Sequence, residues 1–297
     1  MSKKLHGVLT PLVTPFGAEG QIDEGQLRAV VDRSIEGGVH GVVANGTSGE
    51  FQTLTNAERR FVVETVVDQA AGRVPVVAQT GALTAQEAVD LTRHAQEAGA
   101  DVAMVIAPYY DPVSLDAVKA YYRTVAESVD IPIMLYNMPS VTGVNLQSDT
   151  IRELAQLCPN IKYVKNTSPD MAQAVQFVRE LSDVIDTIVG WDTLALSCFV
   201  EGAGLMAITA NVAPGQIVAV YDAIQNKDLA RAQQLWSDLY PFVSGIDTEP
   251  FIAATKFCLK SVGVAVGGTR VPTTPISEAG KENLAKLTSH ALTLPCA

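Results

Sequence analysis

The feature that most constrains the fold is an alternation of short apolar runs with longer segments of helical periodicity, repeated eight times. The apolar runs contain few polar residues, which is typical of parallel strands buried on both faces. The intervening segments place apolar residues three and four positions apart, as in helices packed on such a sheet. The expected strands lie in residues 6–16, 39–45, 74–80, 101–108, 131–139, 161–168, 186–192 and 205–211, and the expected helices in 23–37, 56–71, 84–99, 114–129, 148–157, 170–181, 194–202 and 214–225.

Eight strand–helix units of this length predict a (β/α)8 TIM barrel, of the α/β class, over residues 1–226. An open, doubly wound sheet is the alternative. It would require a glycine-rich fingerprint after the first strand, and none is present there. Residues 227–297 lack a strand pattern and predict a C-terminal extension packed on the barrel, with three helices at 229–243, 250–262 and 277–292.

Composition and charge exclude several classes of partner. The 297 residues are 47% hydrophobic, enough for a large core, and the net charge of −11 argues against binding to nucleic acid or to anionic membranes. The sequence shows no signal-peptide pattern and no apolar run long enough to span a bilayer. Cys158, Cys198, Cys258 and Cys296 have neither metal-site nor disulfide spacing, so we expect free thiols and a cytoplasmic protein.

Polar side chains collect where the expected strands end, which is where a TIM barrel places its active site. Most carry hydroxyl or amide groups, and Lys165 is the one cation among them. The four histidines lie elsewhere, and the carboxylates do not group as in a magnesium site, so we expect no metal and no cofactor. The set comprises Thr10, Thr14, Thr47, Ser48, Glu50, Gln79, Thr80, Tyr109, Tyr110, Tyr136, Asn137, Lys165, Thr167, Asp192 and Asn211.

Lys165 ends an otherwise buried strand, and removing an ammonium group from water is costly. One interpretation is that its long side chain reaches back to solvent. The other is that burial lowers the lysine pKa, so that the free amine attacks a ketone and forms an imine. The protonated imine withdraws electrons from the adjacent carbon, and nearby tyrosine hydroxyls can move the protons. The strand pattern leaves both interpretations open.

Several motifs resemble the dihydrodipicolinate synthase / N-acetylneuraminate lyase family over nearly the whole chain. The motifs are Gly46-Thr47-Ser48-Gly49-Glu50 after the second strand, Pro108-Tyr109-Tyr110 after the fourth, Tyr136-Asn137-Met138-Pro139 with Thr142-Gly143 beyond it at the fifth, Lys165 on the sixth and, more loosely, Arg270-x-Pro272. The resemblance implies a TIM-barrel lyase that forms a Schiff base with pyruvate or another 2-oxo acid, without a cofactor.

The resemblance also implies roles for individual residues. Lys165 would form the imine, Tyr136 would act as acid and base beside it, and Thr47 would belong to a hydroxyl relay. Tyr110 would complete that relay from a neighbouring subunit, as in the tight dimers of the family, which usually pair into homotetramers. Thr47 and Ser48 would bind the carboxylate of the 2-oxo acid. Further substrate contacts are implied for Thr167, Gly190, Asp192 and Ile208.

Val141 departs from the pattern of the lysine-pathway synthases. These enzymes carry an arginine at this position, two residues after the proline of the Tyr-Asn-x-Pro motif, where it holds the carboxylate of the aldehyde substrate. A valine cannot donate to a carboxylate, and losing such a pair costs on the order of 1.5–3 kcal/mol. Trp191-Asp192 resembles the aromatic–acidic pair of the sialic acid lyases, although Ile208 stands where those enzymes tend to carry a hydroxyl. The sequence is thus most similar to the lyase and sugar-acid branch.

We therefore expect a class I aldolase or lyase that reversibly cleaves a 2-oxo acid to pyruvate and an aldehyde through an imine on Lys165. A 2-keto-3-deoxy sugar acid dehydratase is the closest alternative, because it shares the imine and differs in the bond broken. Synthesis of 4-hydroxy-tetrahydrodipicolinate comes third. An inactive barrel that senses 2-oxo acids is disfavoured, since a binding protein has no need of a relay through Thr47, Tyr110 and Tyr136.

Overall fold

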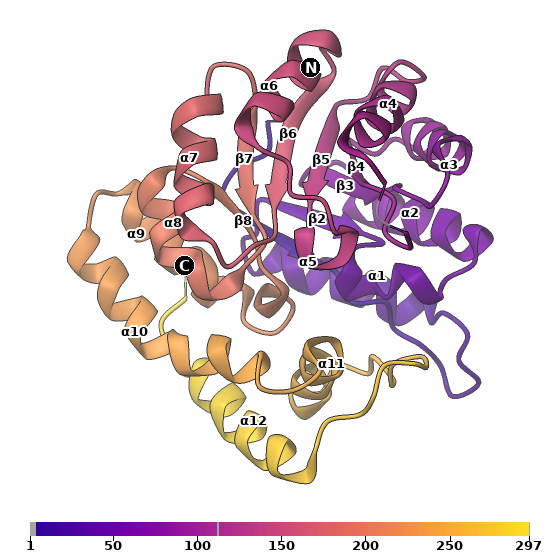
Figure 1. The fold of residues 1–297 in the computed structure, drawn as a ribbon. Helices are drawn as coiled ribbons and strands as arrows, with labels where there is room; N and C mark the ends of the chain where they lie inside the picture. The colour runs from indigo at the N-terminus through magenta and orange to yellow at the C-terminus, as the bar shows by residue number, and fades with distance from the viewer. Residues whose placement is uncertain (1–3, 112, 297) are drawn as a thin grey trace.

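The computed structural model describes residues 4–111 and 113–296, which form a closed barrel surrounded by helices (Figure 1). Within these residues eight parallel strands pair in chain order, and β1 pairs with β8 to close the sheet. The predicted (β/α)8 TIM barrel is therefore confirmed. The strands are β1 (Val8–Pro11), β2 (Gly41–Ala44), β3 (Val76–Gln79), β4 (Val102–Ile106), β5 (Ile133–Asn137), β6 (Ile161–Asn166), β7 (Asp186–Val189) and β8 (Gly204–Met206).

The strands divide the apolar side chains between two cores. One fills the inside of the barrel and includes Met104, Met134 and Tyr163. The other lies between the sheet and the outer helices and includes Val105 and Leu135. Successive side chains of a strand point to opposite faces, so each strand contributes to both cores. This explains why the strands read as continuous apolar runs rather than as alternating ones.

Five of the eight outer helices in the described residues, α1, α2, α3, α4 and α7, begin at a side chain that accepts a hydrogen bond from an N–H group of the first turn. Asp23 and Ser114 cap two of these helices in this way, and Thr55 forms the predicted capping box with Glu58. The helices around the barrel are α1 (Glu24–Glu36), α2 (Asn56–Ala70), α3 (Ala85–Glu97), α4 (Leu115–Ala126), α6 (Ser148–Leu157), α7 (Met171–Leu181), α8 (Ala195–Glu201) and α9 (Pro214–Gln225).

The carboxyl end of the eighth strand differs from the prediction. β8 ends at Met206, and Ile208–Asn211, which we expected to continue the strand, forms the 3-10 helix η4. The buried side chain of Asn211 stabilises this turn, because its amide group donates to the carbonyl oxygens of Pro11 and Ile208, each at 2.9 Å. A hydrogen-bonded asparagine in this position offers the backbone an alternative to the strand ladder.

Within the described residues three helices follow the barrel: α10 (Leu229–Ile246), α11 (Phe251–Ser261) and α12 (Glu278–Ala291). They agree closely with the three helices predicted there, whereas a domain boundary at residue 226 stays a prediction. α10 packs along α9, and α11 contacts η4 beyond β8, so the extension lies beside the carboxyl end of the barrel (Figure 1). The described part of the chain contains no helix with the length and apolar character needed to cross a membrane.

The four cysteines are free thiols, as the sequence predicts. Cys158, Cys198 and Cys258 are buried, and Cys296 is exposed. Burial raises the pKa of Cys198 to about 12 and that of Cys258 to about 11. Both thiols therefore stay protonated at neutral pH and serve as small apolar side chains.

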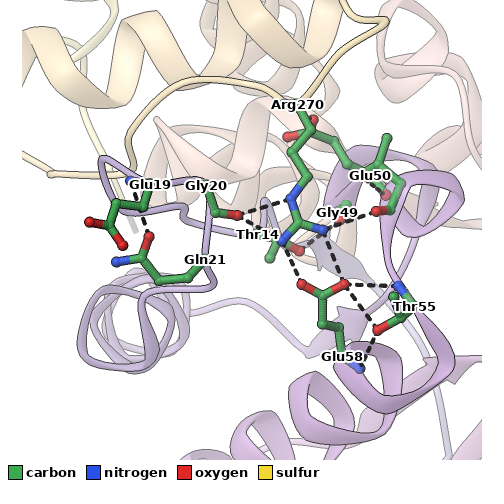
Figure 2. Close-up of polar contacts among 10 residues, drawn as sticks. Thr14, Glu19, Gly20, Gln21, Gly49, Glu50, Thr55, Glu58 and Arg270 are labelled. Carbon is green, nitrogen blue, oxygen red and sulfur yellow. Dashed lines mark hydrogen bonds and ion pairs between the residues drawn. The ribbon is translucent and has the colours of Figure 1, made fainter.

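Arg270 ties the extension to the barrel. Its guanidinium group donates to both carboxylate oxygens of Glu58 on α2, at 2.5 and 3.1 Å, and to the carbonyl oxygens of Gly20 and Thr53 (Figure 2). The hydrogen bond from Arg270 is the main reason why the pKa of Glu58 falls from 4.5 to about 2. A forked pair of this kind is stronger than a single hydrogen bond between neutral groups.

We expect Glu58→Gln to lower the free energy of unfolding at pH 7 by about 1–2 kcal/mol, a value reduced from the full pKa shift because the pair is partly exposed. Since folding lowers the pKa of Glu58, its contribution is complete above pH 4.5 and is lost as the pH falls toward about 2. Urea unfolding at pH 7 and pH 3 checks this, with Glu97→Gln on α3 as the control. An equal loss at both pH values would contradict the assignment.

Candidate active site

A cavity of about 250 Å³ opens at the carboxyl ends of the barrel strands. TIM barrels bind their substrates at this end. Among the described residues that line it, Lys165 is the one cation. No group of three or more His, Cys, Asp or Glu side chains in residues 4–111 and 113–296 is placed to hold a metal ion. The lining comprises Pro11, Thr47, Ser48, Tyr136, Met138, Ser140, Lys165, Thr167, Gly190, Trp191, Asp192, Met206, Ile208, Asp247 and Phe251.

Lys165 lies near the end of β6 and is only 6% exposed. In the register of the sheet it stands beside Tyr136 on β5 and Ile188 on β7. Its Nζ atom lies 4.0 Å from the centroid of the Tyr136 ring, close enough for an attractive contact between a cation and the ring. The amine therefore faces the cavity from inside the barrel, and a side chain that simply reaches bulk solvent does not fit this position.

The Tyr136 hydroxyl lies between two polar atoms. It is 3.3 Å from the Thr47 hydroxyl and 3.2 Å from the sulfur of Met138. Burial disfavours the phenolate, but the charge of Lys165 and the hydrogen bond with Thr47 outweigh it, so the pKa of Tyr136 lies below its usual value of 10. A phenol that ionises more readily is better suited to take up and return a proton near neutral pH.

Thr47 and Ser48 are presented by a tight turn after β2. Residues Thr47–Gly49 form the 3-10 helix η1, which ends where Glu50 adopts a left-handed backbone with φ 58° and ψ 34°. Both Thr47 and Ser48 line the cavity. Their hydroxyls and the backbone N–H groups of such a turn are donors of the kind that bind a carboxylate.

Gly190 leaves room for the side chain of Lys165. A Cβ atom added at Gly190 would lie 2.5 Å from Cε of Lys165 and would also collide with the hydroxyl of Thr167. The hydroxyl of Thr167 is buried and makes no hydrogen bond of regular geometry, although its interaction with Tyr136 helps to lower the pKa of that phenol. Its hydrogen-bonding capacity is therefore not filled, so Thr167 is available to a polar group of a bound molecule.

Acidic side chains form another wall of the cavity. Asp192, which begins η3 (Asp192–Leu194), accepts hydrogen bonds from the backbone N–H of Ile208 and from the N–H and hydroxyl of Thr209. Burial raises the pKa of Asp192, and these hydrogen bonds oppose the rise. Burial and the neighbouring Asp192 raise the pKa of Asp247, just beyond α10, to about 6. At neutral pH Asp247 is mostly ionised, which makes this wall unfavourable for an anion.

The structure brings most of the predicted site residues together. Tyr110 is an exception, because it is 88% exposed in the loop after β4. Val141 is another, because it is 44% exposed on the short helix α5 (Pro139–Thr142), where Ser140 lines the cavity instead. The roles of all the predicted site residues, Tyr110 and Val141 included, stay predictions. The predicted residues that line the cavity are Thr47, Ser48, Tyr136, Lys165, Thr167, Gly190, Asp192 and Ile208.

Seven lining residues were not predicted as site residues: Pro11, Met138, Ser140, Trp191, Met206, Asp247 and Phe251. Met138 and Ser140 flank the proline of the Tyr-Asn-x-Pro motif, so their nearness to the site could have been inferred from the motif. Asp247 directly follows α10 and Phe251 begins α11, and neither carries a local signal of a site. They reach the cavity only because the extension packs against the end of the barrel.

Comparisons with known proteins show which family the chain resembles over nearly its whole length. The model of the dihydrodipicolinate synthetase family matches residues 4–291. A 4-hydroxy-tetrahydrodipicolinate synthase of Phenylobacterium zucineum (strain HLK1) is 40% identical over 276 residues, which are 93% of each chain. The chloride-inhibited dihydrodipicolinate synthase of Acinetobacter baumannii, solved with pyruvate, is 32% identical, with a TM-score of 0.93 over 97% of this chain and 99% of its own.

A second structure solved with pyruvate, a prophage protein of the dihydrodipicolinic acid synthase family from E. coli K12, is 31% identical. Its TM-score is 0.92, over 97% of this chain and 98% of its own. Where the name of one of these relatives states an activity, that activity is a synthase. The sugar-acid and lyase branch expected from Val141 and Trp191 therefore gains no support from them.

Proposed function

Because the chain belongs to the dihydrodipicolinate synthetase family, whose members are Schiff-base-forming lyases, we propose that it joins pyruvate to an aldehyde through an imine on Lys165. The observation that carries this proposal is the buried amine of Lys165, 4.0 Å from the Tyr136 ring, in a cavity at the end of the barrel. The pyruvate complexes of two relatives support pyruvate as the 2-oxo acid. The names of the relatives favour 4-hydroxy-tetrahydrodipicolinate as the product, with aspartate semialdehyde as the aldehyde.

The proposed reaction begins when the free amine of Lys165 attacks the ketone carbon of pyruvate. Loss of water leaves a protonated imine, and removal of a proton from the methyl carbon then gives an enamine. That carbon attacks the aldehyde, whose oxygen takes up a proton. With aspartate semialdehyde, the amino group of the substrate then attacks the imine carbon, loses a proton and displaces the amine of Lys165, which closes the ring of 4-hydroxy-tetrahydrodipicolinate and frees the enzyme. Tyr136 moves these protons, and Thr47, 3.3 Å from its hydroxyl, is its partner in the relay. Thr47 and Ser48 hold the carboxylate of pyruvate.

We place Tyr110 in the same relay, contributed by a neighbouring subunit. Its side chain is 88% exposed in the single chain, which leaves it free to reach a second copy. A homotetramer built as a dimer of dimers would provide that copy. In this arrangement each site is complete only in the assembled protein, which we propose works in the cytoplasm.

Cleavage of a 2-oxo acid is the second candidate, because the described lining residues include no cation besides Lys165, which forms the imine, to hold the carboxylate of aspartate semialdehyde. Val141 cannot supply one, and the described lining residues add Asp192 and Asp247 rather than an arginine. An uncharged, hydroxylated aldehyde suits such a wall better than the carboxylate group of aspartate semialdehyde does. Dehydration of a 2-keto-3-deoxy sugar acid would use the same imine.

One set of assays separates these reactions. The protein is given pyruvate with aspartate semialdehyde, and in separate reactions 2-keto-3-deoxy sugar acids. Consumption of both partners in the first reaction supports the synthase. Release of pyruvate from the sugar acids supports cleavage, and a dehydrated product without pyruvate supports the dehydratase. Failure of all these reactions would contradict the proposal.

We expect Val141→Arg to raise kcat/KM for aspartate semialdehyde by about tenfold or more, because a charge-assisted pair contributes about 1.5 kcal/mol or more. The substituted residue would stand on α5, next to the lining residue Ser140. The control is Val200→Arg, at an exposed position on α8 that is not part of the cavity lining. The same kcat/KM in both variants would show that position 141 does not act on this substrate.

A further inference from the structure

A buried ion pair joins the extension to the loop that carries Thr47 and Ser48. Nζ of Lys256, on α11, lies 2.6 Å from Oε1 of Glu50, which is 206 positions away in the sequence. Their side chains are only 2% and 0% exposed. Among the ion pairs of residues 4–111 and 113–296, no other has both partners so deeply buried. Breaking a pair of this kind leaves an uncompensated charge away from water.

The Glu50 carboxylate is held from more than one side. Its Oε2 atom accepts a hydrogen bond from the backbone N–H of Arg270 at 2.9 Å, while Lys256 binds Oε1. Lys256 also donates to the carbonyl oxygen of Gly268 at 2.7 Å and lies 4.2 Å from the ring centroid of Phe16. Figure 2 shows Glu50 beside Arg270 and close to the Arg270–Glu58 pair. All the donors to this carboxylate thus come from the extension.

The backbone conformation of Glu50 indicates how its ion pair with Lys256 can hold the η1 turn in place. Glu50 is a residue other than glycine in the left-handed region, a conformation that persists only when the surroundings hold it. It ends the η1 turn, where its N–H donates to the carbonyl oxygen of Thr47 at 3.0 Å. The hydroxyl of Thr14 donates a hydrogen bond to the carbonyl oxygen of Gly49, the residue before Glu50, at 2.7 Å. Moving Glu50 would therefore move Thr47 relative to Tyr136.

We propose that Lys256 is a positioning residue, which acts through Glu50 to hold Thr47 and Ser48 against Tyr136 and Lys165. This inference rests on the proposed function, because it assumes that Thr47 takes part in proton transfer. Lys256 does not line the cavity and touches no reacting atom. Its effect comes from geometry, since a displacement of about 1 Å in a catalytic group can cost about 100-fold in rate.

Two substitutions test the proposal. Glu50→Asp keeps both charges of the ion pair but shortens the acidic side chain by one methylene. We therefore expect the protein to fold with the η1 turn pulled toward α11. Lys256→Met removes the pair altogether. We expect kcat to fall about tenfold in the first variant and about 10- to 100-fold in the second. Each kcat is divided by the fraction of Lys165 that borohydride traps with pyruvate, so that loss of folded protein does not count as slower catalysis.

Hydrogen exchange of the peptide that contains residues 46–50 gives a readout that does not depend on activity. We expect faster exchange of this peptide in Glu50→Asp and Lys256→Met. We also expect the high-pH limb of their pH–rate profiles to move to higher pH, because Tyr136 loses the contact with Thr47 that helps to lower its pKa. The matched controls are Glu278→Asp and Lys281→Met, which alter an exposed ion pair on α12 of the same extension. Both controls should behave as the unmodified protein does.

The results distinguish the positioning role of Lys256 from the proposed function. If Glu50→Asp folds and keeps the original kcat per trapped site and the original exchange at 46–50, the positioning role is wrong and the proposed function stands. Glu50→Asp therefore tests the positioning role even if Lys256→Met fails to fold. If the unmodified protein traps no pyruvate on Lys165, the proposed function fails, and the exchange data alone decide whether the pair anchors the turn.

Discussion

Lys165→Met will leave no pyruvate adduct after borohydride reduction, whereas the unmodified protein will gain one on the peptide that contains Lys165. The imine requires an amine that faces the cavity, and Lys165 is the one cation among the described residues lining it. Methionine has a similar length and no charge, so the barrel interior stays filled. Since the reaction has no route without the imine, we expect kcat to fall on the order of 10⁴-fold or more.

Lys162→Met is the matched control. Lys162 lies on the same strand, three residues earlier, and its side chain is exposed. This variant should form the adduct and keep its activity. Mass spectrometry of the reduced and digested proteins reads out both variants, and circular dichroism verifies that each is folded. An adduct on Lys165→Met would place the nucleophile elsewhere and end the proposed mechanism.

Tyr136→Phe will slow turnover by about 10²–10³-fold and leave imine formation detectable. The substitution removes the hydroxyl that lies 3.3 Å from Thr47 but keeps the ring 4.0 Å from the amine of Lys165. Proton transfer therefore suffers while the lysine keeps its place. Because the pKa of Tyr136 lies below 10, the unmodified protein should lose activity as the pH rises toward 10, since the ionised phenol can no longer donate a proton. That limb of the pH–rate profile should be absent in Tyr136→Phe.

Tyr163→Phe provides the comparison for this variant. Tyr163 is also buried inside the barrel on β6, and its hydroxyl accepts a hydrogen bond from the N–H of Leu5 at 3.3 Å, outside the cavity lining. We expect it to retain the pH profile and nearly the full kcat. Steady-state rates from pH 6 to pH 10 measure both variants. Equal rates for Tyr136→Phe and Tyr163→Phe would remove Tyr136 from the proposed chemistry.

The barrel and its reacting pair could be predicted because they depend on local pattern. Apolar runs located the strands, and the order of the strands in a TIM barrel makes β5 and β6 neighbours. Tyr136 and Lys165 each lie near the end of a strand, so their proximity follows from the topology. The resemblance to a family then supplied their roles, which periodicity alone left open.

Contacts between distant segments could not be predicted. Asp247 and Phe251 enter the cavity wall because of how α10 and α11 pack, and no property of residues 247–251 signals it. The pairing of Lys256 with Glu50 is of the same kind, since it depends on where a helix of the extension meets the loop after β2. Ile208–Asn211 was assigned to a strand because the amide contacts of Asn211 that favour a turn are themselves tertiary.

The two separate cores have a consequence for how this protein can be redesigned. The interior core includes Met206, which also lines the cavity, and Met134 lies deeper in the same core. Methionine is unbranched and adapts to irregular space, so substitutions at these positions can change the depth of the cavity. The outer core, which holds the helices to the sheet, would not be disturbed. The size of the accepted substrate is thus a property that can be engineered from beneath the site, separately from the stability of the scaffold.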